Sequence, residues 1–404
     1  MERIIQKIYL ILGITVNWQL GAVSSPLDSF VVAESSLLRT NFCGEKPAHR
    51  QSAKRYGQDS SNTFTWSAYG EFYASIDAIE PRTNQNSLPF LVNHKQINNV
   101  GVNIALVRTH YSNGNTRANA GIMFGDYSRY NLGAEDMSLR NIYELNAGVK
   151  LLKNDNLWLD AGVFESYLGF ESPLGVNNAT LTRSMFAENS PYYLSGVRLQ
   201  FTSRDSRILF SGYYLNGWQR MVRPNGMRGT AWGMHFVFMP TRNTTISYGT
   251  FWGGDGFKQQ LQRSNYKRWF NDVYVLFFPI RKVETGVLCD YGIDYADSRP
   301  TYSWYTVNGF VKYKFTPRFS VTGRAERFSD PNYTVLTTFS PAISNATRFL
   351  MHAYSLNIDM KLNKHVTFRT EARAFESSDY NLVGKRSKPV NSTQVYTASL
   401  CVRF

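Results

Sequence analysis

From Phe64 onward the sequence divides into sixteen short segments in which apolar and polar residues alternate. The connections between these segments alternate in length: long ones, such as 80–96 and 165–190, take turns with short ones, such as 112–115 and 203–206. Antiparallel hairpins that cross a membrane have tight turns on one side and extended loops on the other. A soluble β-sandwich has no reason to sort its turns in this way. The pattern predicts an all-β fold, a transmembrane antiparallel up-and-down β-barrel of about 16 strands, with 14 or 18 strands as open alternatives.

The last segment, residues 396–404, would be the strand that closes this barrel. Its apolar residues share one face of a strand, because side chains repeat with a period of two. These are Tyr396, Ala398, Leu400, Val402 and Phe404, with Thr397, Ser399 and Arg403 on the other face. Such a strand suits a wall with lipid outside and water inside. In a soluble protein the same alternation would place one face on a core, so the rest of the chain has to decide.

The two faces can be assigned along several strands. A Lys or Arg facing lipid at the bilayer midplane costs about 2–4 kcal/mol, so charged residues belong on the inward face. The predicted lipid-facing residues are Val100, Val102, Ile104 and Leu106, then Leu145, Ala147, Val149 and Leu151, then Val197, Leu199 and Phe201, and then Val366, Phe368, Ala372 and Ala374. Tryptophans near the strand ends would form interfacial girdles: Trp66, Trp232, Trp252 and Trp269.

Three parts of the chain are expected to differ in role. Residues 1–24 have a basic start, an apolar run and small residues at cleavage spacing, which predicts a secretory signal peptide. A first strand or core helix is the alternative. Residues 25–62 are polar and weakly periodic, so we expect a flexible periplasmic segment, and 63–404 would form the barrel.

Composition is consistent with a barrel and excludes several other classes. Aromatic residues make up 15% of the chain, yet the mean hydropathy is only -0.33 and no stretch after the N-terminus could form a membrane helix. The net charge is +14, but no basic run, zinc spacing or basic helix predicts nucleic-acid binding. Because the positive charge is dispersed along the chain, we expect it to interact with lipopolysaccharide phosphates or with anionic solutes. Cys43, Cys289 and Cys401 are far apart and support neither a disulfide nor a metal site.

The size of the predicted barrel implies a pore. Eight strands are filled by their own side chains, whereas 16 to 18 leave an aqueous channel, so we expect passive diffusion of small hydrophilic solutes. The predicted pore-lining residues are Lys150, Arg198, Lys312, Arg324, Arg369, Glu371 and Arg373.

The charges on the predicted inward face suggest a selectivity. Basic residues there, with Lys314 added to those of the pore-lining set, slightly outnumber the acidic ones, and rings of Arg and Lys favour anions. The acidic residues counted are Glu71, Asp77, Glu144, Asp160, Glu326 and Glu371. This predicts a weak anion preference. As an alternative, Glu326 and Glu371 would pair with the arginines beside them in ladders that stiffen the wall.

The connection 165–190 is the longest and contains several apolar residues, among them Phe170 and Phe186. A loop surrounded by water would not need them. We therefore expect it to fold back into the barrel and narrow the lumen, with Arg183 and Glu188 near the constriction. The alternative is an exterior cap that packs on neighbouring loops or on a sister subunit.

No motif for catalysis appears, since the sequence has no GxSxG, HExxH or P-loop. No catalytic residue, metal ligand or cofactor is predicted. His235 is expected to point inward, and no Ser and acid partner can be placed beside His352 for a phospholipase. A hydrolase is therefore the weaker alternative to a pore, and a plugged structural or adhesive barrel is the stronger one.

Four stretches resemble a known family. They are 157–172, which begins Leu157-Trp158-Leu159-Asp160-Ala161-Gly162, then Thr182 to Tyr193, then Leu215 to Arg220, and the tail that ends at Phe404. Together they resemble the OmpL-like β-barrel porins of Gram-negative bacteria, especially the form seen in the Bacteroidetes. The resemblance implies a pore in the bacterial outer membrane, surrounded by lipid and lipopolysaccharide. It supplies no solute, and it leaves open whether the protein is a single barrel or a homo-oligomer.

Overall fold

The computed structural model describes residues 62–78, 90–152, 156–223, 230–254, 267–295, 301–336, 347–383 and 388–404. All of them belong to one compact unit, Ala33–Phe404. The predicted signal peptide 1–24 lies outside the described residues, as does the predicted segment 25–62 except for its last residue. Both therefore stay predictions.

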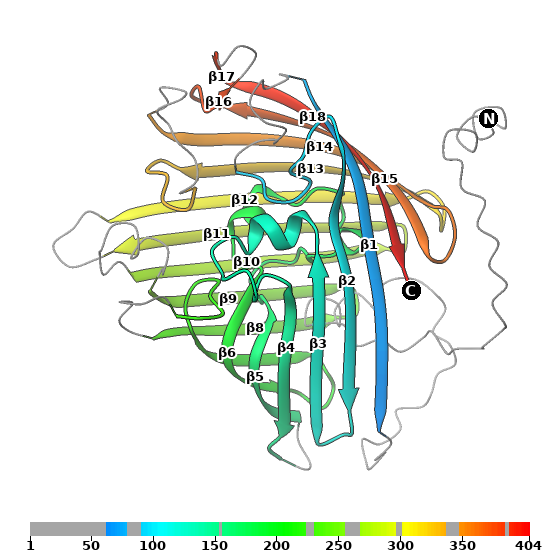
Figure 1. Cartoon of the computed structure of the whole chain (residues 1–404), viewed down its shortest axis with the longest axis vertical. Helices are drawn as coiled ribbons and strands as arrows, with labels where there is room; N and C mark the ends of the chain where they lie inside the picture. The colour runs from blue at the N-terminus through cyan, green and yellow to red at the C-terminus, as the bar shows by residue number, and fades with distance from the viewer. Residues whose placement is uncertain are drawn as a thin grey trace. The chain divides into compact units, whose positions relative to one another are not determined.

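Sixteen of the described strands close into one antiparallel barrel (Figure 1), which confirms the predicted fold and strand number. Each strand pairs with its neighbours in sequence, as an up-and-down barrel requires. Their bounds are β1 (Thr63–Asp77), β2 (Val100–Ser112), β3 (Thr116–Phe124), β4 (Ile142–Lys150), β5 (Asn156–Glu165), β6 (Tyr193–Thr202), β7 (Ile208–Leu215), β8 (Ala231–Thr241), β9 (Thr244–Gly254), β10 (Lys267–Ile280), β11 (Val283–Tyr295), β12 (Tyr302–Lys314), β13 (Phe319–Asp330), β14 (Phe349–Lys361), β15 (Val366–Ser377) and β18 (Ser392–Arg403).

The remaining described elements are short and lie in the long connections. A small hairpin joins β16 (Leu382–Val383) to β17 (Pro389–Val390) between β15 and β18. The helical turns are the π-helix η1 (Tyr127–Asn131), the 3-10 helix η2 (Gly175–Asn177) and the α-helix α3 (Met185–Asn189). None of the described helices has the length and apolarity that crossing a membrane would require.

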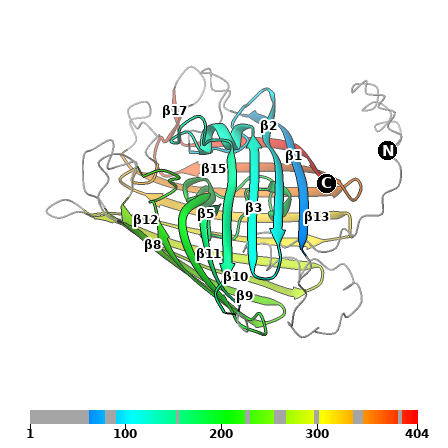
Figure 2. The same ribbon diagram turned by 60° about the horizontal axis from the view of Figure 1, so that its bottom comes forward.

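The barrel is closed by pairing of the first strand with the last. β1 and β18 run antiparallel with Ala74 opposite Ala398, and the Phe404 N–H donates to the Ala68 carbonyl at 2.9 Å. β18 also pairs with β15 on its other side, so the wall is continuous in both ribbon views (Figure 1, Figure 2). The predicted closing strand is confirmed.

The two faces of the wall differ as the alternation predicts for most strands. On β15, Phe368 is exposed on the outer face while Arg369 and Glu371 are buried on the inner face. The outward residues assigned on β4 and β6 are likewise exposed or half-buried. A charged residue on the inner face avoids the cost of facing lipid.

One face assignment was wrong. Val100 and Val102 face outward, but Ile104 and Leu106 are buried on the inner side. The register between β1 and β2 shifts at this point, because Glu71 pairs with Ile104 and Phe72 pairs with Val102, which leaves Asn103 as an extra residue. A β-bulge of this kind moves every later side chain of the strand to the other face.

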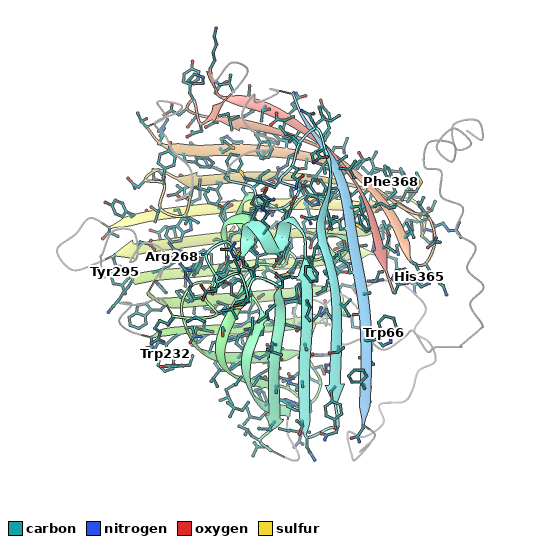
Figure 3. All side chains as sticks on the ribbon, in the orientation of Figure 1. Trp66, Trp232, Arg268, Tyr295, His365 and Phe368 are labelled. Carbon is teal, nitrogen blue, oxygen red and sulfur yellow. The ribbon has the colours of Figure 1, made fainter. Side chains whose placement is uncertain are left out.

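The tryptophans predicted to form girdles do lie on the outside of the wall. Trp66, Trp232, Trp252 and Trp269 are all exposed, and Figure 3 shows Trp66 and Trp232 at the edge of the molecule. Trp66 is near the short turn that follows β2, whereas the other three are at strand ends next to long connections. The two groups therefore mark opposite ends of the barrel, as belts at two interfaces would.

Candidate functional site

The connection between β5 and β6 lies inside the barrel, and we call residues 166–192 the infolded loop. Its residues contact inward side chains of β1, β13, β14 and β15 on one side of the wall. On the other side they contact inward side chains of β8 and β10 and a backbone carbonyl of β9. These two groups of strands are far apart in the order of the barrel. The loop therefore crosses the interior, and the alternative of an exterior cap is wrong. That the loop narrows a conducting pore stays a prediction.

Arginine and glutamate side chains of the wall hold one side of the loop. Arg324 on β13 donates to the Thr182 carbonyl at 2.7 Å, and Glu371 on β15 accepts from the Thr182 N–H at 2.6 Å. Arg369 donates to the carbonyls of Gly175 and Asn178. Backbone N–H and C=O groups in this part of the loop do not pair with a neighbouring strand. The charged side chains of the wall supply the hydrogen-bond donors and acceptors that these groups need.

The same wall residues also pair with one another. Arg324 and Arg373 both contact Glu326, with N–O distances of 3.0 and 2.7 Å, and Arg324 lies 3.2 Å from Glu371. Arg369 pairs with Asp359 at 2.7 Å. The predicted pairing of Glu326 with Arg324 is thus present, whereas Glu371 pairs with Arg324 of β13, and the neighbouring Arg369 and Arg373 pair with Asp359 and Glu326. Because each arginine also reaches the loop, the ladders join the wall to the loop and do more than stiffen the wall.

Aromatic contacts hold the other side of the loop. Tyr167 stacks on Tyr213 with 4.3 Å between ring centroids and donates its hydroxyl to the Thr250 carbonyl at 2.7 Å. Phe170 packs against Tyr274 and Phe310, with ring centroids 5.7 and 5.4 Å apart. The apolar residues that marked this connection in the sequence are therefore buried against the wall.

The predicted constriction residue Glu188 joins the infolded loop to the connection between β1 and β2. Its carboxylate accepts from the backbone N–H of Val92 at 2.6 Å and from the backbone and side chain of Asn93 at 3.0 and 2.9 Å. α3, which carries Glu188, is capped by the Ser184 hydroxyl at 3.2 Å from the Ala187 N–H. Glu188 is therefore buried between two loops.

Arg183, the other predicted constriction residue, is also buried in the loop. Its guanidinium lies 4.0 Å above the ring of Tyr192 and donates to the Glu171 carbonyl at 3.2 Å. The Arg183 carbonyl in turn accepts from Arg373 at 2.8 Å. The positive charge of Arg183 therefore lies inside the barrel, and contacts within the infolded loop hold the side chain in place.

The predicted pore-lining residues fall into two groups. Arg324, Arg369, Glu371 and Arg373 point inward but are covered by the infolded loop. Lys150, Arg198 and Lys312 point inward and are partly exposed. Whether either group lines a conducting path stays a prediction.

Two members of the second group, Lys150 and Arg198, belong to a patch that we call the basic vestibule. It comprises inward-facing, partly exposed cations of β2, β3, β4 and β6 that lie toward the short-turn end of those strands: Arg108, Arg117, Lys150 and Arg198. The carboxylates that pair with the three arginines are buried behind them. Asp160, which is 1% exposed, pairs with Arg117 at 2.6 Å and Arg198 at 3.1 Å.

The vestibule also contains an aromatic surface. The Arg117 guanidinium lies 4.5 Å from the centre of the Trp158 ring, which is partly exposed on β5. Across the barrel, Lys312 is partly exposed and pairs with Asp359 at 2.8 Å. Arg117 and Arg198 therefore meet the water-accessible part of this interior while Asp160 does not, whereas Lys312 and Asp359 are about equally exposed, at 13% and 11%.

Several inward acids were missed by the sequence reasoning. Asp272 on β10 and Asp290 on β11 lie opposite each other and are both buried. Arg268 and Asp294 form another buried pair at 2.8 Å on the same two strands (Arg268 is labelled in Figure 3). Counting every second residue of β10 and β11 would have found all four, because they share the inward parity.

A serine and a histidine do meet inside the barrel. The His235 Nε2 lies 2.9 Å from the Ser247 hydroxyl, which confirms that His235 points inward. Ser247 is fully buried, and Tyr167 of the infolded loop stacks on His235 with ring centroids 5.6 Å apart, so the pair lies beneath the loop. In the described part of the chain no group of three or more His, Cys, Asp or Glu side chains could hold a metal ion.

Comparisons with known proteins agree on the fold. The model of the family described as "Putative beta-barrel porin-2, OmpL-like" matches residues 63–404. No curated protein matches the sequence. The anion-selective porin of Comamonas acidovorans is similar in structure, at 7% identity and a TM-score of 0.56, over 85% of this chain and 100% of that chain.

Two further solved structures are similar. The outer-membrane channel DcaP of Acinetobacter baumannii matches at 10% identity and a TM-score of 0.56, over 86% of this chain and 99% of that chain. The trimer form of OmpT from Vibrio cholerae matches at 10% identity and a TM-score of 0.53, over 85% and 100%. At such identities the likeness shows the fold alone.

Proposed function

The chain belongs to the OmpL-like beta-barrel porin-2 family, and on that premise we propose that it forms a water-filled channel for passive diffusion of small hydrophilic solutes. The family and the fold place the protein in the outer membrane. One observation carries the proposal. The closed 16-strand barrel has partly exposed polar and charged side chains on its inner face, toward the short-turn end of the strands. A barrel of this size encloses more space than its own wall side chains fill.

We also propose a weak anion preference, as the sequence suggests. The basic vestibule supports it, because Arg117, Lys150 and Arg198 are partly exposed while Asp160 is buried behind two of them. The negative charge of buried acids on other strands acts against this anion preference, but only at long range. Solutes respond most to the charges that contact water, since buried pairs largely cancel.

Planar-bilayer recording of the refolded protein tests both parts. We expect discrete conductance steps and, in a salt gradient, a reversal potential of the sign that anion preference gives. The opposite sign would remove the anion preference and keep the channel. Absence of steps at every voltage and salt concentration would remove the channel.

A plugged structural or adhesive barrel is the second candidate. It is favoured by the infolded loop, which is bound to opposite sides of the wall by hydrogen bonds and ring contacts. Liposome swelling in small sugars separates the two functions. Swelling that rises as the sugar becomes smaller supports the channel, and none with any sugar supports the plug.

Enzymatic activity is not part of the proposal, because the Ser247 and His235 pair is covered by the infolded loop. For partners, we propose contact with lipid and lipopolysaccharide through the exposed outer face of the wall. The solved OmpT is described as a trimer. Chemical cross-linking of this protein in native membranes would tell a single barrel from a homo-oligomer.

A further inference from the structure

Asp272 and Asp290 form a carboxyl pair inside the barrel wall. They are direct partners across β10 and β11, and both face inward. Asp272 is 0% and Asp290 4% exposed. Side chains directly opposite each other in an antiparallel pair have Cβ atoms about 5 Å apart, so the two carboxyl groups are neighbours. Among the described residues, no donor makes a hydrogen bond of normal geometry to any of their four carboxyl oxygens.

The other charged and titratable groups around the pair do not neutralise it. His235 on β8 is on the side of Asp272, and Glu171 of the infolded loop is on the side of Asp290. Cys289, the neighbour of Asp290 in sequence, lies on the outward face of β11. Arg268, on the same strand as Asp272, is already paired with Asp294 at 2.8 Å. The pair therefore faces one histidine, one acid and one thiol, and the inward-facing cation of β10, Arg268, is engaged by Asp294.

The infolded loop lies directly on this pair. The backbone of Gly169 is beside Asp272, and Phe170 packs against Tyr274, the next inward residue of β10. Gly169 has φ of +79°, a conformation that favours glycine, and a side chain there would collide with Phe186. The loop is thus shaped to approach the wall closely at this point.

Two ionised carboxylates cannot stay this close in a buried place without donors or a counter-ion. We propose that Asp272 and Asp290 share one proton, and that loss of this proton at alkaline pH releases the part of the infolded loop that covers them. In the protonated pair, the O–H of one carboxylic acid donates to the carboxylate of the other. On deprotonation the proton passes to water, and both groups then require water as a donor.

The structure indicates which part of the loop would move. The wall strands are held by their ladder hydrogen bonds, and residues 175–183 of the loop are tied to Arg324, Arg369 and Arg373. Residues 167–170 are held mainly by ring contacts, plus one hydrogen bond from Tyr167 to the Thr250 carbonyl. Water that enters to solvate the two carboxylates would lift this segment and widen the lumen on the side of β8 to β12.

Infrared spectroscopy of the refolded protein tests the shared proton. At neutral pH the wild type should show the carbonyl stretch of a protonated carboxylic acid, and the band should disappear as the pH is raised. It should be absent from the Asp272→Asn/Asp290→Asn double variant from neutral to alkaline pH, where exposed carboxyl groups are ionised. The control is Asp205→Asn, in the exposed turn between β6 and β7, which should keep the band.

Three infrared results would overturn the proposal. They are a wild type without the band at neutral pH, a double variant that retains it, and carboxylate bands that shift when a chelator is added, which would indicate a bound cation in place of the proton. Amide substitution preserves the shape of both side chains. Heat-modifiable migration in gel electrophoresis would show that the double variant has folded.

Release of the loop is tested separately by hydrogen–deuterium exchange of peptides that cover 167–171. We expect protection to fall, after correction for the intrinsic pH dependence, over the range in which the infrared band is lost, and no such fall in the double variant. If protection of these peptides in the wild type does not change as the pH rises, the proposed release of the loop is wrong. The further expectation of a rise in conductance over that range rests on the proposed function. A protein that never conducts would refute that function without affecting the infrared and exchange results.

Discussion

Asn93 donates both its backbone N–H and its side-chain amide to the carboxylate of Glu188, at 3.0 and 2.9 Å. The two residues come from different connections of the barrel, one between β1 and β2 and the other between β5 and β6. Because Val92 adds a third donor at 2.6 Å, one carboxylate joins two loops within the lumen.

Replacing Glu188 by Ala should loosen both connections. The buried donors of Val92 and Asn93 would lose their acceptor, so we expect the free energy of unfolding to fall by about 3 kcal/mol. Glu188→Gln retains a carbonyl acceptor, so its free energy of unfolding should fall clearly less. Urea unfolding in lipid vesicles measures both variants, and an Ala variant no less stable than the Gln variant would contradict the prediction.

Arg183 should influence conduction through both its position and its charge. Arg183→Ala removes the ring contact with Tyr192 and one positive charge, so we expect larger single-channel conductance and a lower ratio of anion to cation permeability. Arg183→Lys keeps the charge and should keep the permeability ratio. If the Ala variant conducts like the wild type with the same ion preference, Arg183 does not lie near the constriction.

The basic vestibule should set the sign of the selectivity. Arg117→Gln and Arg198→Gln each remove a partly exposed cation beside the buried Asp160, so the reversal potential in a salt gradient should shift toward cation preference. The matched control is Arg207→Gln, in the exposed turn between β6 and β7. A control that shifts as far as the two vestibule variants would assign the selectivity to charge outside the lumen.

The connection between β1 and β2 should become more stable as the pH rises from about 8 to 10.5. Burial lowers the pKa of Lys95 to about 8 from its usual 10.5, although Glu188 and Asp126 act in the opposite direction. In this window the unfolded chain binds more protons than the folded one, so stability increases with pH, by at most about 3 kcal/mol. Hydrogen–deuterium exchange of peptides from 90–99 should show the rise. Lys95→Met should abolish it, and persistence in that variant would assign the effect to another group.

A charge placed on the outer face of the wall should be costly. Val273 is exposed near the middle of β10, between the inward residues Asp272 and Tyr274. Val273→Arg should lower the free energy of unfolding in vesicles by about 2–4 kcal/mol, because the guanidinium would face hydrocarbon. Val273→Leu, the control, should leave stability nearly unchanged. Equal stabilities of the two variants would mean that this face does not contact lipid.

The strand pattern was predictable because it depends on a local rule. A wall with lipid on one side and water on the other forces successive residues to differ, so Phe368 and Arg369 reveal their faces without any knowledge of the partner strand. The rule failed at Ile104 and Leu106. The bulge at Asn103 adds one residue to β2, and nothing in the sequence of β2 marks it.

Entry of the connection 165–190 into the barrel was also predictable, because apolar residues in a long loop require a surface to cover them. Its partners were not. Glu188 meets Asn93 from 95 residues away, and Thr182 meets Glu371 from 189 residues away. Contacts of this kind depend on where the wall closes, which no local pattern encodes.

The sequence by itself thus determined a closed wall with an apolar exterior, a charged interior and one long connection able to enter it, because each of these follows from local alternation and composition. Only the tertiary structure decided that Arg324, Arg369 and Arg373 bind the loop, and that Asp272 and Asp290 lie opposite each other. The physical reason is register. Which inward side chains face one another is fixed by strand pairing and barrel closure, and a shift of one residue would move each of them to the other face.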